Sequence, residues 1–146
     1  VSLNDDPAYY RKLSERLEEI IQKYYDNWEE QARQLLLFKE ECMNEPTPPE
    51  GLTNAELPFY NLYTEVLEKH FDEDQVPYED AKKIASELVA YLNEVSQIVD
   101  FFNKPDEIKR LKRKINDLIL QTDHSDQDLI NNITESFMDL ARHKYA

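Results

Sequence analysis

Glycine and cysteine are among the scarcest residues in this chain of 146, which has one of each. A β-rich fold with tight hairpins needs several residues that tolerate positive φ, and glycine supplies this most readily. A single glycine, Gly51, therefore predicts a mostly helical fold. It also excludes a nucleotide-binding loop, because such loops expose backbone N–H groups at glycine turns. We expect no ATP hydrolysis by this chain alone.

The lone cysteine, Cys42, allows neither a disulfide framework nor a Cys-based zinc site. This usage is typical of proteins in a reducing interior, so we expect a cytoplasmic location. The chain also lacks an apolar run of about 20 residues, the length that spans a bilayer. It begins with Val1 and not with methionine, so we expect residues 1–146 to be a single domain cut from a longer chain.

Positive charge is scarce overall but concentrated in one place. The formal net charge is −14, yet six of the seventeen Lys and Arg residues fall within residues 104–114. The same segment contains two acids, Asp106 and Glu107, so its net charge is +4 and that of the rest of the chain is −18. The apolar content of 40% is high enough for the chain to fold despite this charge.

Apolar residues recur at steps of three and four along the chain, which predicts an all-α fold. We expect an irregular bundle of about five helices with its own hydrophobic core. Asp6 as N-cap and Pro7 mark the first helix, whose pattern extends toward Cys42. The proline-rich segment 44–51 is expected to be the loop that ends it.

Three further helix starts carry capping signals. Thr53 and Glu56 have capping-box spacing, with Pro58 expected to distort the first turn. A third helix is expected to run through the stripe from Ala81 to about residue 98. The fourth predicted helix follows a cap at Asn103 or Lys104, and the fifth follows a cap at Ser125 or Asp126.

No catalytic or metal-binding constellation is apparent. The histidines, His70, His124 and His143, lack zinc-ligand spacing and are expected at the surface. Glu107 and Lys109 match the Glu-x-Lys element of two-metal nucleases, but they fall in the first turn of a predicted helix. A charged helix start is the favoured interpretation. We therefore predict no catalytic residue and no metal site in this chain.

The basic segment forms one side of the fourth predicted helix. At about 100° per residue, its apolar positions fall on one stripe and most of its bases on the opposite side. Two interpretations stay open from the residues alone: contact with a nucleic-acid phosphate backbone, or internal pairing with the acidic remainder. The residues concerned are Lys104, Lys109, Arg110, Lys112, Arg113 and Lys114.

Four segments together resemble the C-terminal helical domain of the motor (restriction) subunit of type I restriction-modification enzymes. They are residues 6–25, 50–63, 80–92 and 100–120. The most specific block comprises Gly51, Leu52, Thr53, Glu56, Phe59 and Tyr60. Where many relatives carry an Ile-Asp-Trp element, this chain has Asp100-Phe101-Phe102, and the resemblance covers roughly residues 5–120.

This resemblance implies a bacterial, cytoplasmic parent subunit that couples ATP-dependent DNA translocation to endonucleolytic cleavage. The parent would bind ATP and magnesium elsewhere, leaving this C-terminal fragment non-catalytic and without a cofactor. The fragment is expected to help assembly with the methyltransferase and specificity subunits and to contact double-stranded DNA. The DNA-binding candidates are the six basic residues above, and the partner-binding candidates are Glu56, Phe59 and Tyr60.

Two other functions remain possible at this point. The fragment could be purely a protein-docking module, in which acidic surfaces engage a basic methyltransferase core and no residue touches DNA. An acidic DNA mimic that inhibits nucleases would explain the net charge of −14, but it explains neither the basic segment nor the resemblance.

Overall fold

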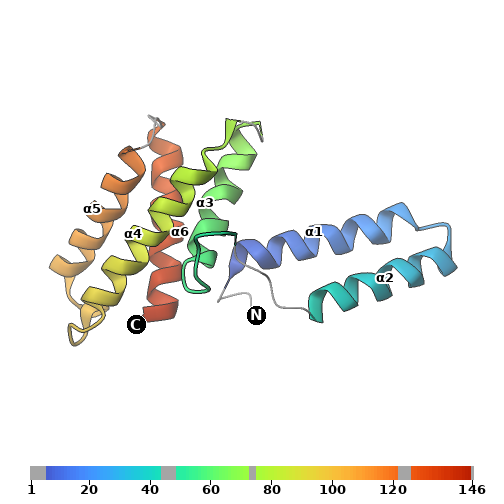
Figure 1. Ribbon diagram of the computed structural model, residues 1–146, viewed down its shortest axis with the longest axis horizontal. Helices are drawn as coiled ribbons and strands as arrows, with labels where there is room; N and C mark the ends of the chain where they lie inside the picture. The colour runs from blue at the N-terminus through green and yellow to red at the C-terminus, as the bar shows by residue number, and fades with distance from the viewer. Residues whose placement is uncertain (1–5, 44–48, 73–74, 122–125, 146) are drawn as a thin grey trace.

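The computed structural model describes residues 6–43, 49–72, 75–121 and 126–145. These residues contain six α-helices, the short 3-10 helix η2 and no strand (Figure 1), which confirms the all-α prediction. The elements are α1 (Pro7–Lys23), α2 (Trp28–Met43), α3 (Leu57–His70), α4 (Tyr78–Val95), η2 (Phe101–Asn103), α5 (Pro105–Leu120) and α6 (Gln127–Tyr145).

The first predicted helix is in fact two helices, so its expected continuation toward Cys42 is wrong. The helix α1 ends at a turn around Tyr24, and the side-chain Oδ1 of Asn27 accepts a hydrogen bond of 3.1 Å from the N–H of Glu30. An asparagine in that position is a strong N-cap, and acids in the following turn favour a new helix start. The chain therefore reverses between α1 and α2.

Two of the predicted helix caps are confirmed. The Oδ1 of Asp6 accepts a 3.2 Å hydrogen bond from the N–H of Tyr9 at the start of α1. The Oδ1 of Asp126 accepts one of 3.3 Å from the N–H of Leu129 in α6. The alternative cap, Ser125, lies outside the described residues. Each cap satisfies a backbone donor that the helix itself leaves without a partner.

The capping box before α3 forms as predicted, but the regular helix begins later than its cap. The Glu56 N–H lies 3.4 Å from Thr53 Oγ1, and the Thr53 N–H donates to Glu56 Oε1 at 3.2 Å. Pro58 has no N–H to continue the ladder, so α3 starts at Leu57. In the described part of the preceding loop, Gly51 has φ of +89°, a value that favours glycine.

The core lies among α3, α4, α5 and α6, which pack side by side as a bundle (Figure 1). The central helix is α3, which contacts α1, α4 and α6 and is buried around most of its circumference. The rings of Phe59 and Phe137 meet edge to face at 5.7 Å, and Tyr63 lies 6.4 Å from Phe137. This aromatic cluster joins α3 to α6.

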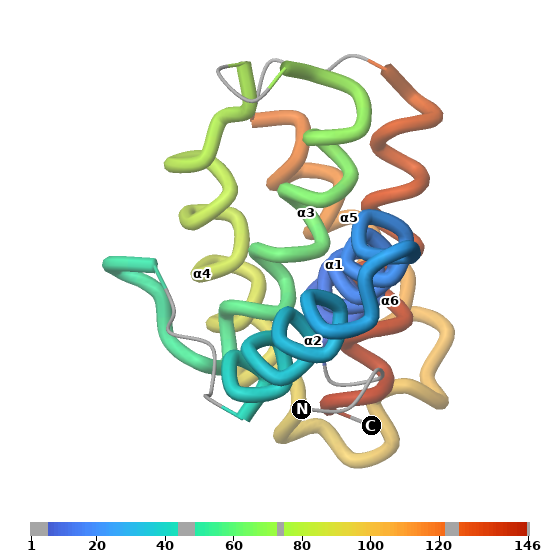
Figure 2. Tube along the Cα trace, turned by 90° about the vertical axis from the view of Figure 1, so that its right-hand side faces the viewer, coloured from blue at the N-terminus to red at the C-terminus, as the bar shows by residue number. Residues whose placement is uncertain are grey.

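The helices α1 and α2 form an antiparallel hairpin that projects away from the bundle (Figure 1), and Figure 2 shows the two helices nearly end on. We call this hairpin, residues 7–43, the arm. Ala8 is fully buried at its base, whereas residues 9–43 include no buried residue. In Figure 1 the arm and α5 lie at opposite ends of the long axis of the molecule. The arm is thus attached through one end of α1.

Polar contacts with α3 fix the base of the arm. Arg11 binds Glu65 with two parallel bonds, Nη2 to Oε1 at 2.5 Å and Nε to Oε2 at 2.7 Å. The Oδ2 of Asp6 accepts a 3.1 Å hydrogen bond from the side chain of Asn61. Burial of Asp6 raises the pKa of its carboxyl, which these hydrogen bonds partly oppose. These contacts orient α1 relative to the bundle.

Candidate nucleic-acid and partner interface

The helix α5 buries its predicted apolar stripe and exposes its bases. Leu111, Ile115, Leu118 and Ile119 lie in the core, as the helical periodicity predicted. We call the cations of residues 104–114 the basic face of α5. Most of them lie opposite the apolar stripe, whereas Lys104 is the N-cap residue and Lys112 lies near the boundary of the stripe. The basic face comprises Lys104, Lys109, Arg110, Lys112 and Arg113, which are exposed, and Lys114, which is half-buried. The fold therefore presents these cations to solvent and leaves the apolar stripe to hold the helix in place.

Internal ion pairs occupy part of the basic face. Arg110 lies 3.2 Å from Glu107 in the preceding turn, and Lys112 lies 3.7 Å from Glu135 of α6. Exposed pairs of this kind contribute about 0–1 kcal/mol each, so they do not account for the cluster. Within the described residues, four members of the basic face form no ion pair: Lys104, Lys109, Arg113 and Lys114.

The basic face is short. From Lys109 to Lys114 the helix rises roughly 7.5 Å, at about 1.5 Å per residue. Successive phosphates on one strand of duplex DNA are spaced about 3.4 Å along the axis, so this length corresponds to roughly two phosphate intervals. By helical periodicity, the exposed acids Asp106 and Asp117 flank Arg113 on its own side. The face can add a few phosphate contacts to a larger site.

The three partner-binding candidates occupy very different positions. Phe59 is fully buried within the aromatic cluster, and Glu56 is 7% exposed in the capping box with Thr53. Tyr60 is half-buried, and burial raises the pKa of its hydroxyl. Tyr60 is therefore the most accessible of the three, and their contact with a partner stays a prediction.

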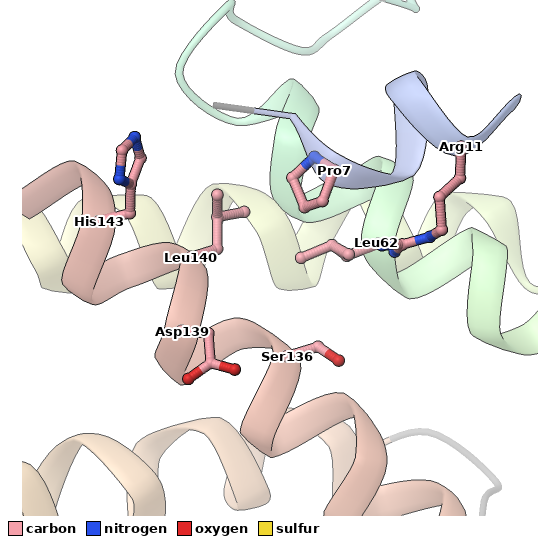
Figure 3. Close-up of a pocket in the computed structure, with 7 residues that line it drawn as sticks. All are labelled: Pro7, Arg11, Leu62, Ser136, Asp139, Leu140 and His143. Carbon is pink, nitrogen blue, oxygen red and sulfur yellow. The ribbon is translucent and has the colours of Figure 1, made fainter. Parts of the chain in front are cut away.

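A shallow hollow of about 290 Å³ lies where the base of the arm meets the bundle. Figure 3 shows its lining residues from α1, α3 and α6, with the side chains of Asp139 and His143 pointing away from each other. Ser136 points in a third direction, so the three do not form a proton relay. The lining is Pro7, Arg11, Leu62, Ser136, Asp139, Leu140 and His143.

The described residues also contain no group of three or more His, Cys, Asp or Glu side chains that could hold a metal ion. Glu107, half of the nuclease-like pair, is bonded to Arg110 in the first turn of α5. That placement fits the charged helix start favoured from the sequence. Nowhere in the described ranges does a helix have the length and apolarity to cross a membrane.

Comparison with known proteins yields a distant relation to a restriction system. No protein-family model matches the chain, and no solved structure matches it. A protein of Methanocaldococcus jannaschii described as "Putative type I restriction enzyme MjaIXP endonuclease subunit" is 28% identical over 99% of this chain. The chain spans 15% of that relative's length. This similarity supports a relation to restriction enzymes, in agreement with the resemblance noted from the sequence.

Proposed function

We propose that this chain is a non-catalytic helical module of a type I restriction enzyme motor subunit. In this proposal it helps the motor assemble with the methyltransferase and specificity subunits, and it contacts the backbone of double-stranded DNA. The observation that carries the DNA contact is the exposed basic face of α5 in a chain of net charge −14. The name of the M. jannaschii relative supports the restriction context.

The catalytic work is assigned to other parts of the parent subunit. ATP-dependent translocation, DNA cleavage, and the binding of ATP and magnesium would all take place outside this chain. The single glycine of the sequence, which allows no glycine-rich phosphate-binding loop, supports that division. The module would then act through surfaces, as a structural part of a cytoplasmic complex.

The charge balance determines when the module would touch DNA. A net charge of −14 repels a free duplex, so binding by the isolated chain would be weak. Within the complex, other subunits supply positive charge, and the basic face adds sequence-independent phosphate contacts. Each contact should contribute about −0.9 to the slope of log affinity against log salt concentration.

The test uses the full motor subunit reconstituted with its methyltransferase partner on duplex DNA. The variant Lys109→Gln/Arg113→Gln removes two cations that have no internal ion pair in the described structure. The salt slope should become shallower by about 1.8, which is two phosphate contacts. A matched control, Lys69→Gln/Lys83→Gln, removes two exposed lysines elsewhere. An unchanged slope in the first variant would contradict the DNA contact.

A purely docking role is the second candidate, and the charge of −18 outside residues 104–114 favours it. Such a module would bind a basic methyltransferase surface and leave DNA untouched. Assembly measured without DNA tests the docking role that both candidates share, and the salt slope separates them. Deleting residues 1–146 should abolish assembly under either candidate. If the module only docks, the Lys109→Gln/Arg113→Gln variant should keep both assembly and the full salt slope.

A further inference from the structure

Exposed apolar side chains are concentrated on the arm. Within the described residues, ten large apolar side chains are exposed, and seven of them belong to the arm. Trp28 is 85% exposed and Tyr25 is 75% exposed. The seven are Leu17, Ile21, Tyr25, Trp28, Leu36, Leu37 and Met43. A surface of this kind commonly marks a protein-interaction site.

These side chains lie beside the contact between α1 and α2. That contact uses half-buried positions, among them Leu13, Ile20 and Tyr24 on α1 and Leu35 and Phe38 on α2. A pair of helices can bury one stripe on each partner, and the neighbouring stripe stays in solvent. The exposed residues are therefore additional to those that the hairpin needs for its own packing.

Helical periodicity places the exposed stripes of both helices on one side of the arm. At about 100° per residue, Leu17 and Ile21 are turned from the α1 contact stripe by roughly 40–80°. Tyr25 is exposed in the turn that follows α1. Trp28, Leu36 and Met43 are turned in the same sense from the α2 contact stripe. Because the helices run antiparallel, equal rotation brings both stripes to the same broad side. We call these six residues the apolar face of the arm.

The opposite side of the arm carries charged side chains together with one exposed apolar residue, Leu37. There Arg16 of α1 forms an ion pair with Glu41 of α2 at 2.5 Å and lies 5.4 Å from the ring of Phe38. Lys23 and Glu30 occupy the same side by helical periodicity. The arm therefore has one broad side where charged residues predominate and one that is mainly apolar.

Acids border the apolar face on both edges. Glu18 follows the α1 stripe, and Glu29 and Glu40 follow the α2 stripe. All three are exposed, while one base, Lys39, lies within the α2 stripe. Two copies of the chain joined through this face would bring acidic edges together, and each copy carries −14. The borders thus select a basic partner and disfavour self-association.

We propose that the apolar face of the arm binds a helix of another protein, one whose apolar stripe is flanked by lysines and arginines. Such a helix would lie along α1 and α2 and complete a three-helix unit. Trp28 and Leu36 would be the main anchors, because Trp28 is the largest and most exposed of these side chains and Leu36 lies midway along α2. The inference rests on the proposed function only in assuming that the chain works within an assembly.

The chain supplies its own probe, because Trp28 is the one tryptophan and belongs to the apolar face. The ligand to add is a synthetic helical peptide with leucines at heptad a and d positions and lysines elsewhere. A second peptide carries the same leucines with glutamates in place of lysines. The lysine peptide should shift Trp28 emission to the blue as the indole leaves water, and the glutamate peptide should leave it unchanged.

Two variants show whether the shift reports this face. Ile21→Ser/Leu36→Ser should weaken binding of the lysine peptide at least about tenfold, since two buried contacts are lost. Val99→Ser/Leu120→Ser changes two exposed apolar residues of the bundle and should bind as the parent does. Circular dichroism verifies that each variant keeps its helices, and Leu36→Ser alone serves if the double variant unfolds.

Three results would overturn the proposal. They are equal shifts with both peptides, no shift with the lysine peptide, or a shift that persists in Ile21→Ser/Leu36→Ser. A dimer seen in sedimentation that the same variant dissociates would assign the face to a second copy instead. No restriction subunit or DNA is present in this assay, so its failure leaves the proposed function standing, and the salt-slope test fails or succeeds separately.

Discussion

The bundle and the arm use apolar residues in opposite ways. In the bundle, Phe59, Leu88, Leu111 and Ile133 are at most 1% exposed, whereas the arm buries a single residue, Ala8. The helix α3 has neighbours on three sides, and α2 contacts chiefly α1. A helix can bury only the stripes that have partners. The comparison indicates that the bundle supplies stability and that the arm supplies a surface.

Replacing a side chain in the aromatic cluster should have the largest effect on stability. Phe137→Ala removes a fully buried ring that joins α6 to α3, and we expect a loss of about 3–5 kcal/mol in the free energy of unfolding. Urea denaturation followed by circular dichroism measures it. Val99→Ala, at a 77% exposed site, should change stability by less than about 0.5 kcal/mol. A loss below 1 kcal/mol for Phe137→Ala would contradict the division between bundle and arm.

Breaking the base of the arm should have an intermediate effect. Arg11→Met leaves Glu65, which is 10% exposed, without its bidentate partner. We expect the free energy of unfolding to fall by about 1–3 kcal/mol. This loss is smaller than that for a fully buried ion pair, because Arg11 is 44% exposed. Amide hydrogen exchange should quicken in α1 and stay unchanged in α5. Arg33→Met, which removes an exposed partner of Glu30, is the control and should leave α1 exchange as it was.

Removing the cap of α2 should affect the arm alone. Asn27→Ala deletes the hydrogen bond to the Glu30 N–H, which costs about 1 kcal/mol for a helix N-cap. Exchange should quicken at residues 28–31 and not in the bundle. Asn93→Ala, at an exposed position inside α4, is the matched control. Equal destabilisation of both regions would show that arm and bundle unfold as one unit.

The smallest effect concerns the pH dependence of the arm's attachment. Burial raises the pKa of Asp6 above its usual 3.8, so the folded state binds this proton more readily than the unfolded state. Stability from Asp6 is therefore gained as the pH falls from 7 through the folded pKa, and the gain is complete below 3.8. Asp6→Asn removes this gain and keeps an acceptor for the Tyr9 N–H.

Thermal melting of both proteins across that range measures the difference. The melting temperature of the parent minus that of Asp6→Asn should rise as the pH falls, because only the parent gains a proton at this site. If this difference in melting temperature stayed constant or fell on acidification, burial would not raise the pKa of the Asp6 carboxyl in the folded state.

Local signals in the sequence predicted much of the fold. The caps at Asp6 and Asp126, the capping box at Thr53 and the buried stripe of α5 all depend on neighbours within one or two turns. The break at Asn27 was also readable, because Asn27 precedes Glu29 and Glu30 in a cap pattern. It was missed because the apolar spacing continues across the turn.

Tertiary contacts decided what the sequence did not reveal. Phe59 was assigned to partner binding, and only the packing of α6 against α3 shows that it is buried. The exposure of the apolar face of the arm could not be predicted from the sequence either. Ile21 and Leu36 have the spacing of core residues, and they are exposed because no third helix packs against α1 and α2. The exposed basic face of α5 followed from periodicity alone, and its binding to DNA stays a prediction.

The aromatic cluster also has a consequence for the order in which the protein folds during synthesis. Phe59 and Tyr63 emerge early, but the ring that covers them, Phe137, is made 78 residues after Phe59. Until α6 is made, α3 can pack only on α1 and α4, and the rings of Phe59 and Tyr63 lack the ring of Phe137 that covers them. Nascent chains that stop before α6 should therefore be prone to aggregate and depend on chaperones, because closure of the core waits for the last helix.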